Sequence, residues 1–382
     1  MDFALTEEQS AIYDMARSFA DENIAPFAIE WDEKRHFPID VIRQTAELGM
    51  AGIYVGEEHG GSALSRLDAT LIFEALSHGC PTVAAFISIH NMCAWMVDVF
   101  GSPDMRQKWV PKLCSMEKIA SYCLTEPGSG SDAASLRTTA TRKGDTLVLN
   151  GTKAFISGGG VSDVYLVMVR TGEDGPSGIS AILVEDGTPG LSFGANERKM
   201  GWNAQPTAQV QFDDCVVPAE NLIGEEGAGF KYAMKGLDGG RLNISACSLG
   251  AAQSALDKAA RYMHERSAFG KPLAGFQALQ FKLADMEIEL QAARVFLRQA
   301  AWKLDNATPD ASQHCAMAKR FVTDIAFNVA NEALQIHGGY GYLADYGVEK
   351  IVRDLRVHQI LEGTNEIMRL IVARNLLKDT AP

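Results

Sequence analysis

Apolar residues recur every three or four positions through the first third of the chain, which is the period of an amphipathic α-helix. The first helix is predicted to begin at Thr6, because Thr6 and Gln9 have the spacing of a capping box, and to end near Pro26. Glycines follow the later apolar runs, so further helices are expected to end close to them. These helices are predicted at residues 39–48, 66–77 and 82–100.

The pattern changes near residue 119, where short runs rich in β-branched and aromatic residues begin to alternate with turn sequences. Signals such as Lys143-Gly144-Asp145 mark the turns between the runs. Short strands at this spacing favour a β-sandwich or barrel over a parallel βαβ sheet. The strands are predicted at residues 120–125, 135–141, 146–150, 164–170, 179–185 and 208–212.

Helical spacing returns at residue 225 and continues to the end of the chain, with long helices predicted at 229–266, 311–337 and 348–360. One apolar seam has the steps of four and three residues that are typical of a helix bundle. The seam residues are Leu279, Leu283, Met286, Leu290, Ala293 and Leu297. The sequence therefore predicts an α+β multidomain protein. Its parts are an N-terminal helical domain at 1–118, a middle β-barrel or sandwich domain at 119–224 and a C-terminal four-helix bundle at 225–382.

The composition of the 382-residue chain is that of an ordinary globular protein, with 47% hydrophobic and 22% charged residues. A net charge of −13 argues against a nucleic-acid footprint and against binding to an anionic membrane surface. The chain has no run of about 18 uninterrupted apolar residues, so no transmembrane helix is predicted. The seven cysteines are scattered and form no C-x-x-C pair, which indicates reduced core residues instead of disulfides or a zinc site.

The stretch RVHQILEGTNEIMRLIVAR, at residues 356–374, places Glu362 between two apolar helical runs. Gly363 is predicted to stop the first helix, and Thr364 or Asn365 to cap the second. A carboxylate in apolar surroundings becomes more basic, because burial disfavours its charged form. Glu362 is therefore a candidate general base for removing a proton next to a carbonyl group. The alternative, from this stretch alone, is an ordinary turn with a solvated glutamate.

Two turn-rich segments of the β region offer contacts to a planar or phosphate-bearing ligand. YCLTEPGSGSD, at residues 122–132, formally matches G-x-G-x-x-A, but the β-rich sequence after it does not fit a βαβ unit. Its backbone amides and hydroxyls can still cradle a polar ring edge. In AFISGGG, Phe155 and Ser157 are expected on the same side of a strand, as an aromatic face and a donor. A plain β-turn and a core phenylalanine are the alternatives.

The C-terminal part carries three further candidate segments. The run 238–241, DGGR, places two glycines in a helix, which implies either a close approach to the helix face or a kink. Arg241 offers a cation to an anionic group, with a surface salt bridge as the alternative. RSAFGKPLAGFQ, at residues 266–277, and QIHGGY, at residues 335–340, join helices and fit simple connectors, with an anion site as the alternative for the glycine-rich helix end in QIHGGY. His337 by itself fits a hydrogen-bonded core histidine better than a metal ligand.

Six segments occur together and in one order: YCLTEPGSGSD, AFISGG, KMGWNAQPT, RSAFGKPL, QIHGGYGY and LEGTNEIMRLIVAR. This combination resembles the acyl-CoA dehydrogenase family across essentially the whole chain. The resemblance implies a helical N-terminal domain, a middle β-barrel and a C-terminal four-helix bundle. It also implies FAD as cofactor, an acyl-CoA substrate, electron-transfer flavoprotein as electron acceptor, and a homotetramer built as a dimer of dimers. No metal, nucleic acid or membrane partner is expected.

The resemblance also implies roles for individual residues. Glu362 matches the catalytic base, and some members of the family place the base at the position of Gly240, which here has no side chain. The run 335–339 with Arg266 and Gln277 is expected to contact FAD across the dimer. The expected FAD contacts are Tyr122, Leu124, Thr125, Gly130, Ser131, Phe155, Ile156, Ser157, Arg266, Phe276, Gln277, Gln335, Ile336, His337, Gly338, Gly339, Thr364, Asn365 and Glu366. The expected substrate contacts are Ser131, Asp238, Gly239, Gly240, Arg241 and Gly363.

The implied reaction is the α,β-dehydrogenation of a short branched-chain acyl-CoA, from isobutyryl-CoA to methacrylyl-CoA in valine breakdown. The alternatives are another short-chain substrate (butyryl- or 2-methylbutyryl-CoA), an oxidase-type relative that reduces oxygen, and a non-enzymatic nucleic-acid-binding relative. The acidic N-terminus, MDFALTEEQ, has the features of neither a signal peptide nor a transit peptide. A bacterial cytoplasmic location is therefore expected, or the mitochondrial matrix if the chain is a processed eukaryotic one.

Overall fold

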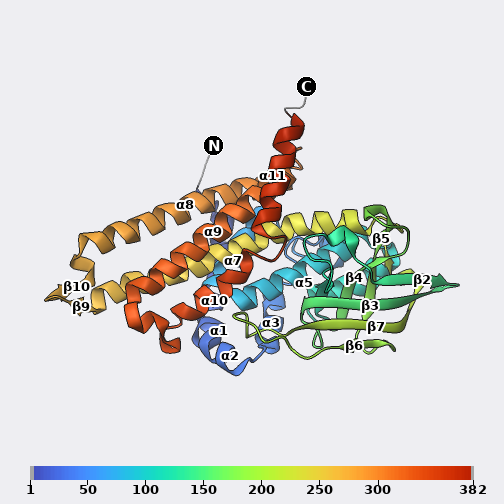
Figure 1. The fold of residues 1–382 in the computed structure, drawn as a ribbon, viewed down its shortest axis with the longest axis horizontal. Helices are drawn as coiled ribbons and strands as arrows, with labels where there is room; N and C mark the ends of the chain where they lie inside the picture. The colour runs from blue at the N-terminus through green and yellow to red at the C-terminus, as the bar shows by residue number, and fades with distance from the viewer. Residues whose placement is uncertain (1–3, 380–382) are drawn as a thin grey trace.

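The computed structural model describes residues 4–379 and joins a bundle of long helices to a β-sheet that lies at one end of the molecule (Figure 1). The first helix begins as predicted, because the Thr6 hydroxyl accepts a hydrogen bond from the Gln9 N–H at 3.1 Å and the Gln9 side chain accepts one from the Thr6 N–H at 3.2 Å. The N-terminal helices are α1 (Glu7–Asn23), α2 (Ala28–Lys34), α3 (Ile39–Gln44), α4 (Arg66–Gly79), α5 (Pro81–Phe100) and α6 (Pro103–Cys114). Helix α6 has no counterpart among the individually predicted helices, although Ser102 caps it.

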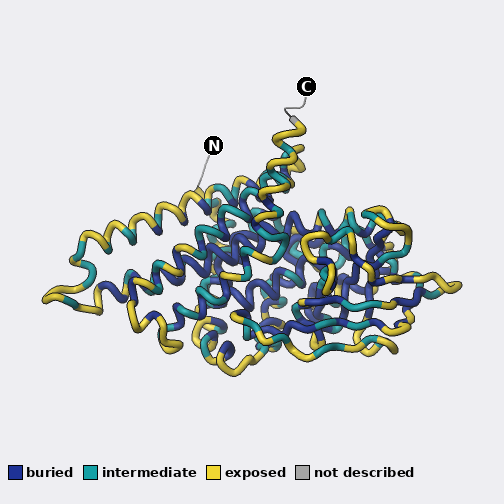
Figure 2. The backbone as a smooth tube through the Cα atoms, viewed as in Figure 1, coloured by how far each residue is buried: buried dark blue, intermediate teal, exposed yellow. Residues whose placement is uncertain are grey.

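Helices α4 and α5 lie against the long helix α7 (Gly229–Glu265) and place the main apolar core at the centre of the molecule (Figure 2). Helix α5 is long and apolar enough to cross a membrane by length and composition, but 72% of its most apolar window is buried inside the protein. A core helix that is covered on nearly all sides explains this composition.

The middle of the chain forms a mixed eight-stranded sheet in the order β6-β7-β3-β2-β4-β5-β8, and β1 pairs with β4 off this path. Strand β4 pairs in parallel with β1 and with β2, and the remaining pairs of this sheet are antiparallel. The strands are β1 (Ala120–Cys123), β2 (Thr139–Lys143), β3 (Thr146–Ser157), β4 (Val164–Arg170), β5 (Ile179–Glu185), β6 (Leu191–Phe193), β7 (Thr207–Pro218) and β8 (Leu222–Ile223).

Alternate residues of β4 serve two different apolar cores. Tyr165 and Val167 belong to a cluster that consists of residues from the sheet strands themselves. Leu166 and Met168 belong to a cluster shared with α5, α6 and α7. Because neighbouring side chains of a strand point to opposite faces, the sheet encloses an interior of its own and presents its other face to the helices. This arrangement agrees with the predicted sandwich or barrel.

The strand predictions are accurate for β4 and β5 and wrong at the ends of several others. The predicted strand 135–141 begins too early, because Ala133–Ser135 form the 3-10 helix η4 and β2 starts at Thr139. Strand β3 continues past Asn150, where the predicted strand ends, and Gly151 adopts a φ of 146° beside a shift in the pairing register. The short strands β6 and β8 were not predicted, because two or three residues carry too little periodicity.

The C-terminal helices follow α7 and confirm the predicted bundle. They are α8 (Gln277–Asp305), α9 (Ala311–His337), α10 (Val348–His358) and α11 (Asn365–Asp379), with the hairpin β9 (Ser267–Ala268) and β10 (Lys271–Pro272) between α7 and α8. The seam residues from Met286 to Leu297 are buried. The 3-10 helices are η1 (Ala25–Phe27), η2 (Thr45–Leu48), η3 (Glu57–His59), η4 (Ala133–Ser135), η5 (Pro176–Gly178), η6 (Ala219–Asn221), η7 (Leu273–Gly275), η8 (Gly338–Tyr342) and η9 (Ala344–Tyr346).

Candidate active site

Glu362 lies in the short joint between α10 and α11, and both its backbone and that of Gly363 are left-handed, with φ of 57° and 86°. A left-handed conformation costs a residue other than glycine about 1–2 kcal/mol, so neighbouring contacts must hold Glu362 there. The Thr364 hydroxyl accepts a hydrogen bond from the Ile367 N–H at 3.3 Å and caps α11. Asn365 does not cap the helix, because its buried side chain turns inward to Thr323 and α9.

The Glu362 carboxyl is desolvated, as predicted, although the residue as a whole is half-buried. Its Oε2 is buried and has no hydrogen-bond partner among residues 4–379. Burial raises the pKa of Glu362 to about 7, while the charges of Arg241 and Lys319 act in the opposite direction. The alternative of a solvated turn is therefore wrong, and the role of Glu362 as a base stays a prediction.

The two glycines of the DGGR run allow close approaches, and α7 continues through them without a break. A Cβ at Gly240 would lie 2.5 Å from Glu362 Oε2, and a Cβ at Gly239 would lie 2.3 Å from Nη1 of Arg66. Arg66 is itself buried, with its guanidinium 3.5 Å from the centre of the Tyr54 ring. The side of α7 that carries Gly240 therefore faces the carboxyl directly.

Arg241 holds the joint from the same helix. Its Nη1 donates to Asp238 Oδ1 at 2.7 Å, and its Nε donates to the backbone carbonyl of Glu362 at 3.3 Å. The second carboxylate oxygen of Asp238 accepts a hydrogen bond from Ser312 at 2.5 Å. Because Arg241 and Asp238 are both buried, the surface salt bridge considered for Arg241 is wrong. Contact between Arg241 and an anionic part of a substrate stays a prediction.

The segment 122–132 leaves β1 and lies beside the Glu362 joint. The Tyr122 hydroxyl is buried without a hydrogen-bond partner in the described part of the chain, and burial together with the Glu362 charge raises the pKa of Tyr122. Leu124 is buried and Thr125 half-buried, whereas Gly130 and Ser131 are exposed. A Cβ added at Gly130 would meet no atom within 4 Å, so the turn borders open space.

Strand β3 presents Phe155 to solvent. The side chain is 67% exposed, and its backbone has a φ of 59° at a shift in the pairing register. Ser157 is half-buried, and its hydroxyl accepts a hydrogen bond from Gln205 at 3.5 Å. Ile156 is buried in the interior of the sheet, so only its backbone is available to a ligand. An exposed aromatic ring held by a left-handed backbone is typical of a binding surface.

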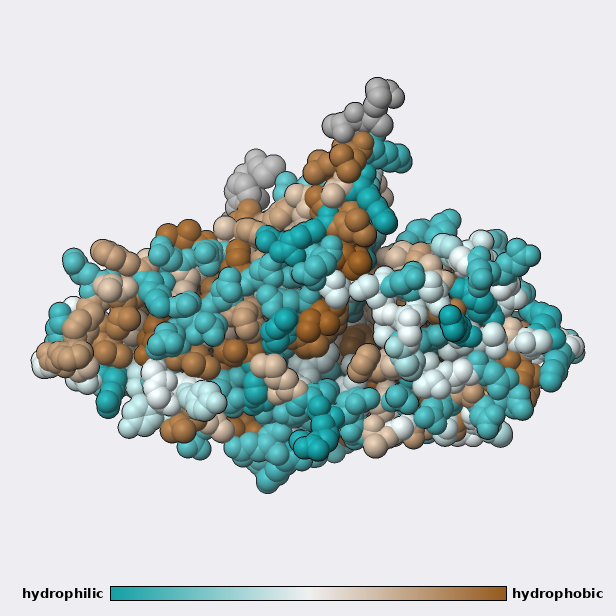
Figure 3. Space-filling model, viewed as in Figure 1, coloured by the Kyte–Doolittle hydropathy of each residue, from teal (hydrophilic) through white to brown (hydrophobic). Residues whose placement is uncertain are grey.

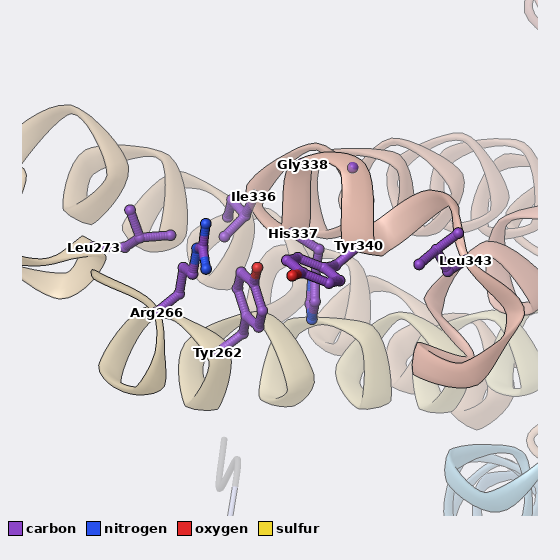
Figure 4. A pocket seen from close by; sticks show the side chains of 9 residues that line it. Tyr262, Arg266, Leu273, Ile336, His337, Gly338, Tyr340 and Leu343 are labelled. Atoms are coloured by element: carbon purple, nitrogen blue, oxygen red, sulfur yellow. The ribbon is translucent and has the colours of Figure 1, made fainter. Parts of the chain in front are cut away.

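A second group of predicted residues lies at the far end of the bundle, around a cavity of about 350 Å³ (Figure 4). The guanidinium of Arg266 lies 5.5 Å from the centre of the Tyr340 ring. His337 stacks on Tyr262, with 4.4 Å between ring centres, and its Nδ1 is 2.7 Å from the Ala333 carbonyl, which confirms a hydrogen-bonded core histidine. Ile336, Gly338 and Gly339 line the same cavity. Gln335 and Gln277 are exposed nearby in sequence, and Phe276 is half-buried.

One chain therefore brings the predicted residues together as two groups and not as one. Lys319, which bonds the Glu362 joint, and His337 are 18 residues apart on α9. At 1.5 Å per residue this separates the two groups by roughly 27 Å along the helix. Thr364 lies in the first group, and Glu366, on the first turn of α11, has a side chain that is 79% exposed. Contact between the second group and the cofactor of a neighbouring subunit stays a prediction.

Sequence reasoning missed several buried charges that support the site. Lys319 is fully buried on α9 and donates to the Gly363 carbonyl. Lys153 is fully buried under the segment 122–132, where it forms an ion pair with Glu126 at 2.7 Å. A signal for Lys319 was present, because it occupies a position in the apolar stripe between Cys315 and Val322. A charged residue in such a stripe requires a buried partner.

The first group of residues fits a large planar cofactor with a polar edge. Phe155 offers an aromatic face, the Gly130 turn borders open space, and the Tyr122 hydroxyl and Glu362 Oε2 are buried polar atoms without partners in the described residues. Figure 3 shows the surface hollowed where the helices meet the sheet. Among the described residues, no group of three or more His, Cys, Asp or Glu side chains is placed to hold a metal ion.

Comparison with known proteins gives matches over nearly the whole chain. Models of the N-terminal, middle and C-terminal domains of acyl-CoA dehydrogenases match residues 6–117, 121–215 and 227–377. Isobutyryl-CoA dehydrogenases, both named as mitochondrial, are 56% identical in Bos taurus and 58% identical in Dictyostelium discoideum, each over 98% of this chain and 90% of the relative. The structure of butyryl-CoA dehydrogenase from Megasphaera elsdenii is 40% identical with a TM-score of 0.96, over 99% of this chain and 100% of that chain.

Proposed function

The chain belongs to the acyl-CoA dehydrogenase family of FAD-dependent oxidoreductases, and on this premise we propose that it dehydrogenates isobutyryl-CoA to methacrylyl-CoA. Support for a short branched-chain substrate comes from relatives named isobutyryl-CoA dehydrogenase that are 56% and 58% identical. The reaction would place the protein in valine breakdown. Glu362 is the proposed base, and the buried Oε2 of its carboxylate, which has no hydrogen-bond partner in the described residues, is the observation that carries the proposal.

The proposed work of Glu362 is to remove the proton from the carbon next to the thioester carbonyl. A carboxylate with its pKa raised to about 7 accepts a proton more readily than an ordinary glutamate, and part of it is still ionised at neutral pH. Gly240 leaves the space in front of Glu362 Oε2 free of side-chain atoms. Closure of this space around a substrate would exclude water and keep the carboxylate basic.

The first group of site residues is proposed to hold FAD, which when bound accepts the hydride that leaves the β-carbon of the substrate. Phe155 would provide the apolar face beside the ring, and Ser157 and the Thr125 backbone would supply polar contacts at its edge. Tyr122 would also contact the cofactor, and its hydroxyl is near enough to Glu362 for the Glu362 charge to help raise the pKa of Tyr122. Asp238 and Arg241 are proposed to lie near the CoA side of the substrate.

Electron-transfer flavoprotein is the proposed acceptor, and a homotetramer built as a dimer of dimers is the proposed assembly. The distance between the two groups of site residues supports a cofactor shared between subunits, because residues at the far end of one bundle would meet the cofactor of its neighbour. Helix α8 exposes Phe281, Ile288 and Trp302 to solvent. Apolar side chains on one exposed helix fit a surface that another subunit covers.

A second candidate substrate is butyryl-CoA, because the butyryl-CoA dehydrogenase of Megasphaera elsdenii has nearly the same fold. Straight and branched four-carbon acyl groups differ by the position of one methyl group, and such differences change rates by about 10- to 200-fold in a fitted pocket. A comparison of rates therefore separates the two candidates.

The test is anaerobic reduction of the bound flavin by isobutyryl-, butyryl- and 2-methylbutyryl-CoA. The rate of each reduction is measured from the loss of flavin absorbance. Isobutyryl-CoA is expected to react fastest in the unaltered protein. Glu362→Gln is expected to keep the bound flavin and to slow reduction by about 10²- to 10⁴-fold, because the amide cannot accept the proton. Glu47→Gln, which alters an exposed carboxylate far from this joint in the sequence, should react normally.

Near-normal reduction in Glu362→Gln would show that another group is the base. Faster reduction by butyryl-CoA would assign the second candidate substrate. Rapid peroxide release in air would indicate the oxidase alternative, and salt-dependent retention on DNA without flavin reduction would indicate the non-enzymatic one.

A further inference from the structure

Lys319 is a fully buried cation beneath the Glu362 joint. Its Nζ donates hydrogen bonds to the Gly363 carbonyl and to Asn365 Oδ1, both at 2.9 Å. The first contact reaches the residue directly after Glu362, and the second reaches the first residue of α11. Lys319 lies on α9 and therefore bonds to two residues that follow the carboxylate, Gly363 in the turn and Asn365 at the start of α11.

Asn365 extends this attachment. Its side-chain amide donates to Thr323 Oγ1 at 3.0 Å and to Asp324 Oδ1 at 2.7 Å, and both acceptors lie one turn along α9 from Lys319. The Asn365 backbone N–H donates to the Gln359 carbonyl at 3.0 Å. The start of α11 is thus bonded to α9 through Lys319, Thr323 and Asp324. Without Lys319, the carbonyl of the half-buried Gly363 would lose its cationic donor.

The backbone of the joint needs such support. Glu362 and Gly363 are both left-handed, and glutamate does not favour that conformation by itself. Arg241 donates to the Glu362 carbonyl at 3.3 Å from one side, and Lys319 donates to the Gly363 carbonyl from the other. Two buried cations on two helices therefore hold consecutive carbonyl groups and direct the carboxyl toward Gly240.

We propose that Lys319 is a positioning residue for Glu362, which holds the α10–α11 joint in its left-handed conformation and stabilises the ionised carboxylate by its nearby charge. The inference rests on the proposed function of Glu362 as the base. Lys319 acts through the backbone of the joint and through its charge, and it is not assigned a contact with the substrate.

The charges around this joint come from several elements. Arg241 on α7 and Lys319 on α9 favour the ionised form of Glu362, while the Glu362 charge acts on Tyr122 of β1 and on Cys93 of α5. Burial lowers the pKa of Lys319 to about 7, and Glu362, Asp324 and Glu366 counteract this effect while Arg241 adds to it. The Lys319 charge also acts on the buried His358 of α10.

The test compares Lys319→Met with the unaltered holoprotein. Methionine keeps the length and apolar stem of lysine but has neither its charge nor its donors. The flavin reduction rate is expected to fall by about 10- to 100-fold with little change in KM, because the base is misplaced. The acid limb of the rate–pH profile is expected to move upward by about 1 pH unit, because the carboxylate loses a cationic neighbour.

A second measurement is independent of activity. Hydrogen exchange of the peptide that contains residues 359–368 is expected to become faster in Lys319→Met, because the Gly363 and Asn365 contacts are lost. Lys319→Arg keeps the charge and the donors, so it is expected to leave the acid limb in place even where the larger side chain lowers the rate.

Lys350→Met is the matched control, because Lys350 is another buried lysine, ion-paired with Asp354 at 2.6 Å and not bonded to the Glu362 joint. It is expected to lower the melting temperature without moving the acid limb. A folded Lys319→Met protein with an unaltered acid limb and unaltered exchange at 359–368 would overturn the inference. Loss of the proposed function itself would look different, because acyl-CoA would then fail to reduce the flavin of the unaltered protein, while the exchange experiment would still report on Lys319.

Discussion

At the scale of single residues, the site depends on backbone conformations that are unusual for the side chains involved. Phe155 and Glu362 are both left-handed residues other than glycine, with φ of 59° and 57°. Phe155 is turned out of the sheet into solvent, and Glu362 is turned inward against α7. Such conformations persist only where surrounding contacts determine them. Gly240 complements them, because the space that its missing side chain leaves is the space in front of the carboxyl.

Gly240→Ala is expected to lower activity without lowering thermal stability. The new Cβ would lie 2.5 Å from Glu362 Oε2, and the end of a flexible glutamate can move away from it. The melting temperature should therefore stay constant or rise, since alanine in a helix is favoured over glycine by about 0.5–1 kcal/mol. The rate of flavin reduction should fall by about 10- to 100-fold, because the displaced carboxyl is no longer in the position from which it is proposed to remove the substrate proton.

Gly236→Ala is the control for this change. It lies one turn earlier on α7, where the new Cβ would lie 2.9 Å from Sδ of the flexible Met96 side chain. Thermal unfolding and flavin reduction should both stay close to those of the unaltered protein. A Gly240→Ala variant that is equally active would mean that the Glu362 carboxyl does not work from the position seen here.

At the scale of elements, a buried ion pair fastens the segment 122–132 to β3. Lys153 Nζ donates to Glu126 Oε1 at 2.7 Å and to the Leu124 carbonyl at 3.1 Å. Glu126 also accepts hydrogen bonds from the backbone N–H groups of Arg137 and Thr138. Burial acts to raise the pKa of Glu126, but Lys153 and these donors lower it overall. The segment is therefore held by an ionised pair next to the Phe155 surface.

Lys153→Met is expected to lower the free energy of unfolding by about 3–5 kcal/mol, because Glu126 would be left as a buried charge without its cation. Chemical denaturation measures this difference. Adding Glu126→Gln should restore part of the loss, since the remaining group is then neutral. Arg142→Met, which breaks the exposed pair with Glu226, should change stability by less than about 1 kcal/mol. If Lys153→Met and Arg142→Met lowered the free energy of unfolding equally, burial would not be what makes the Lys153–Glu126 pair important.

At the scale of the whole molecule, two buried neutral histidines join parts that are distant in sequence. His90 on α5 accepts a hydrogen bond from the Ala120 N–H of β1 through Nδ1 at 3.1 Å. His358 on α10 accepts one from the Trp202 indole through Nε2 at 3.2 Å. In each ring one nitrogen is an acceptor, so the ring is neutral. Burial lowers the pKa of His90 to about 4 and that of His358 to about 3.

These histidines are expected to make the protein unstable in acid. Between about pH 6.5 and pH 4 both rings gain a proton in the unfolded chain but largely not in the folded one, so the unfolded state binds more protons and stability falls with falling pH. Each histidine should contribute about 1.4 kcal/mol per pH unit between pH 6 and 4.5. Chemical denaturation at several pH values measures how steeply the free energy of unfolding falls with falling pH. The substitution His90→Asn should reduce this slope by about 1.4 kcal/mol per pH unit. An unchanged slope in His90→Asn would mean that other titrating groups cause the loss of stability in acid.

The sequence by itself determined the order of the parts, the long helices and the segments of the site. Period and capping carry this information locally, which explains why α9 and β4 begin and end where predicted. A glutamate followed by glycine between two apolar runs marked Glu362 as a candidate, with a solvated turn as the alternative. Resemblance to a family added the cofactor and the roles, because six segments in one order identify the family more specifically than any local pattern does.

Only the tertiary structure decided which of these segments meet. Lys319, Arg241 and Gly240 are far from Glu362 in the chain, and their contacts arise because α7 and α9 pack against the joint. The same packing leaves Arg266 and the His337 cavity at the other end of the bundle. The desolvation that makes a carboxylate basic depends on all the groups around it. It is therefore a property of the folded molecule, which local sequence indicates but does not determine.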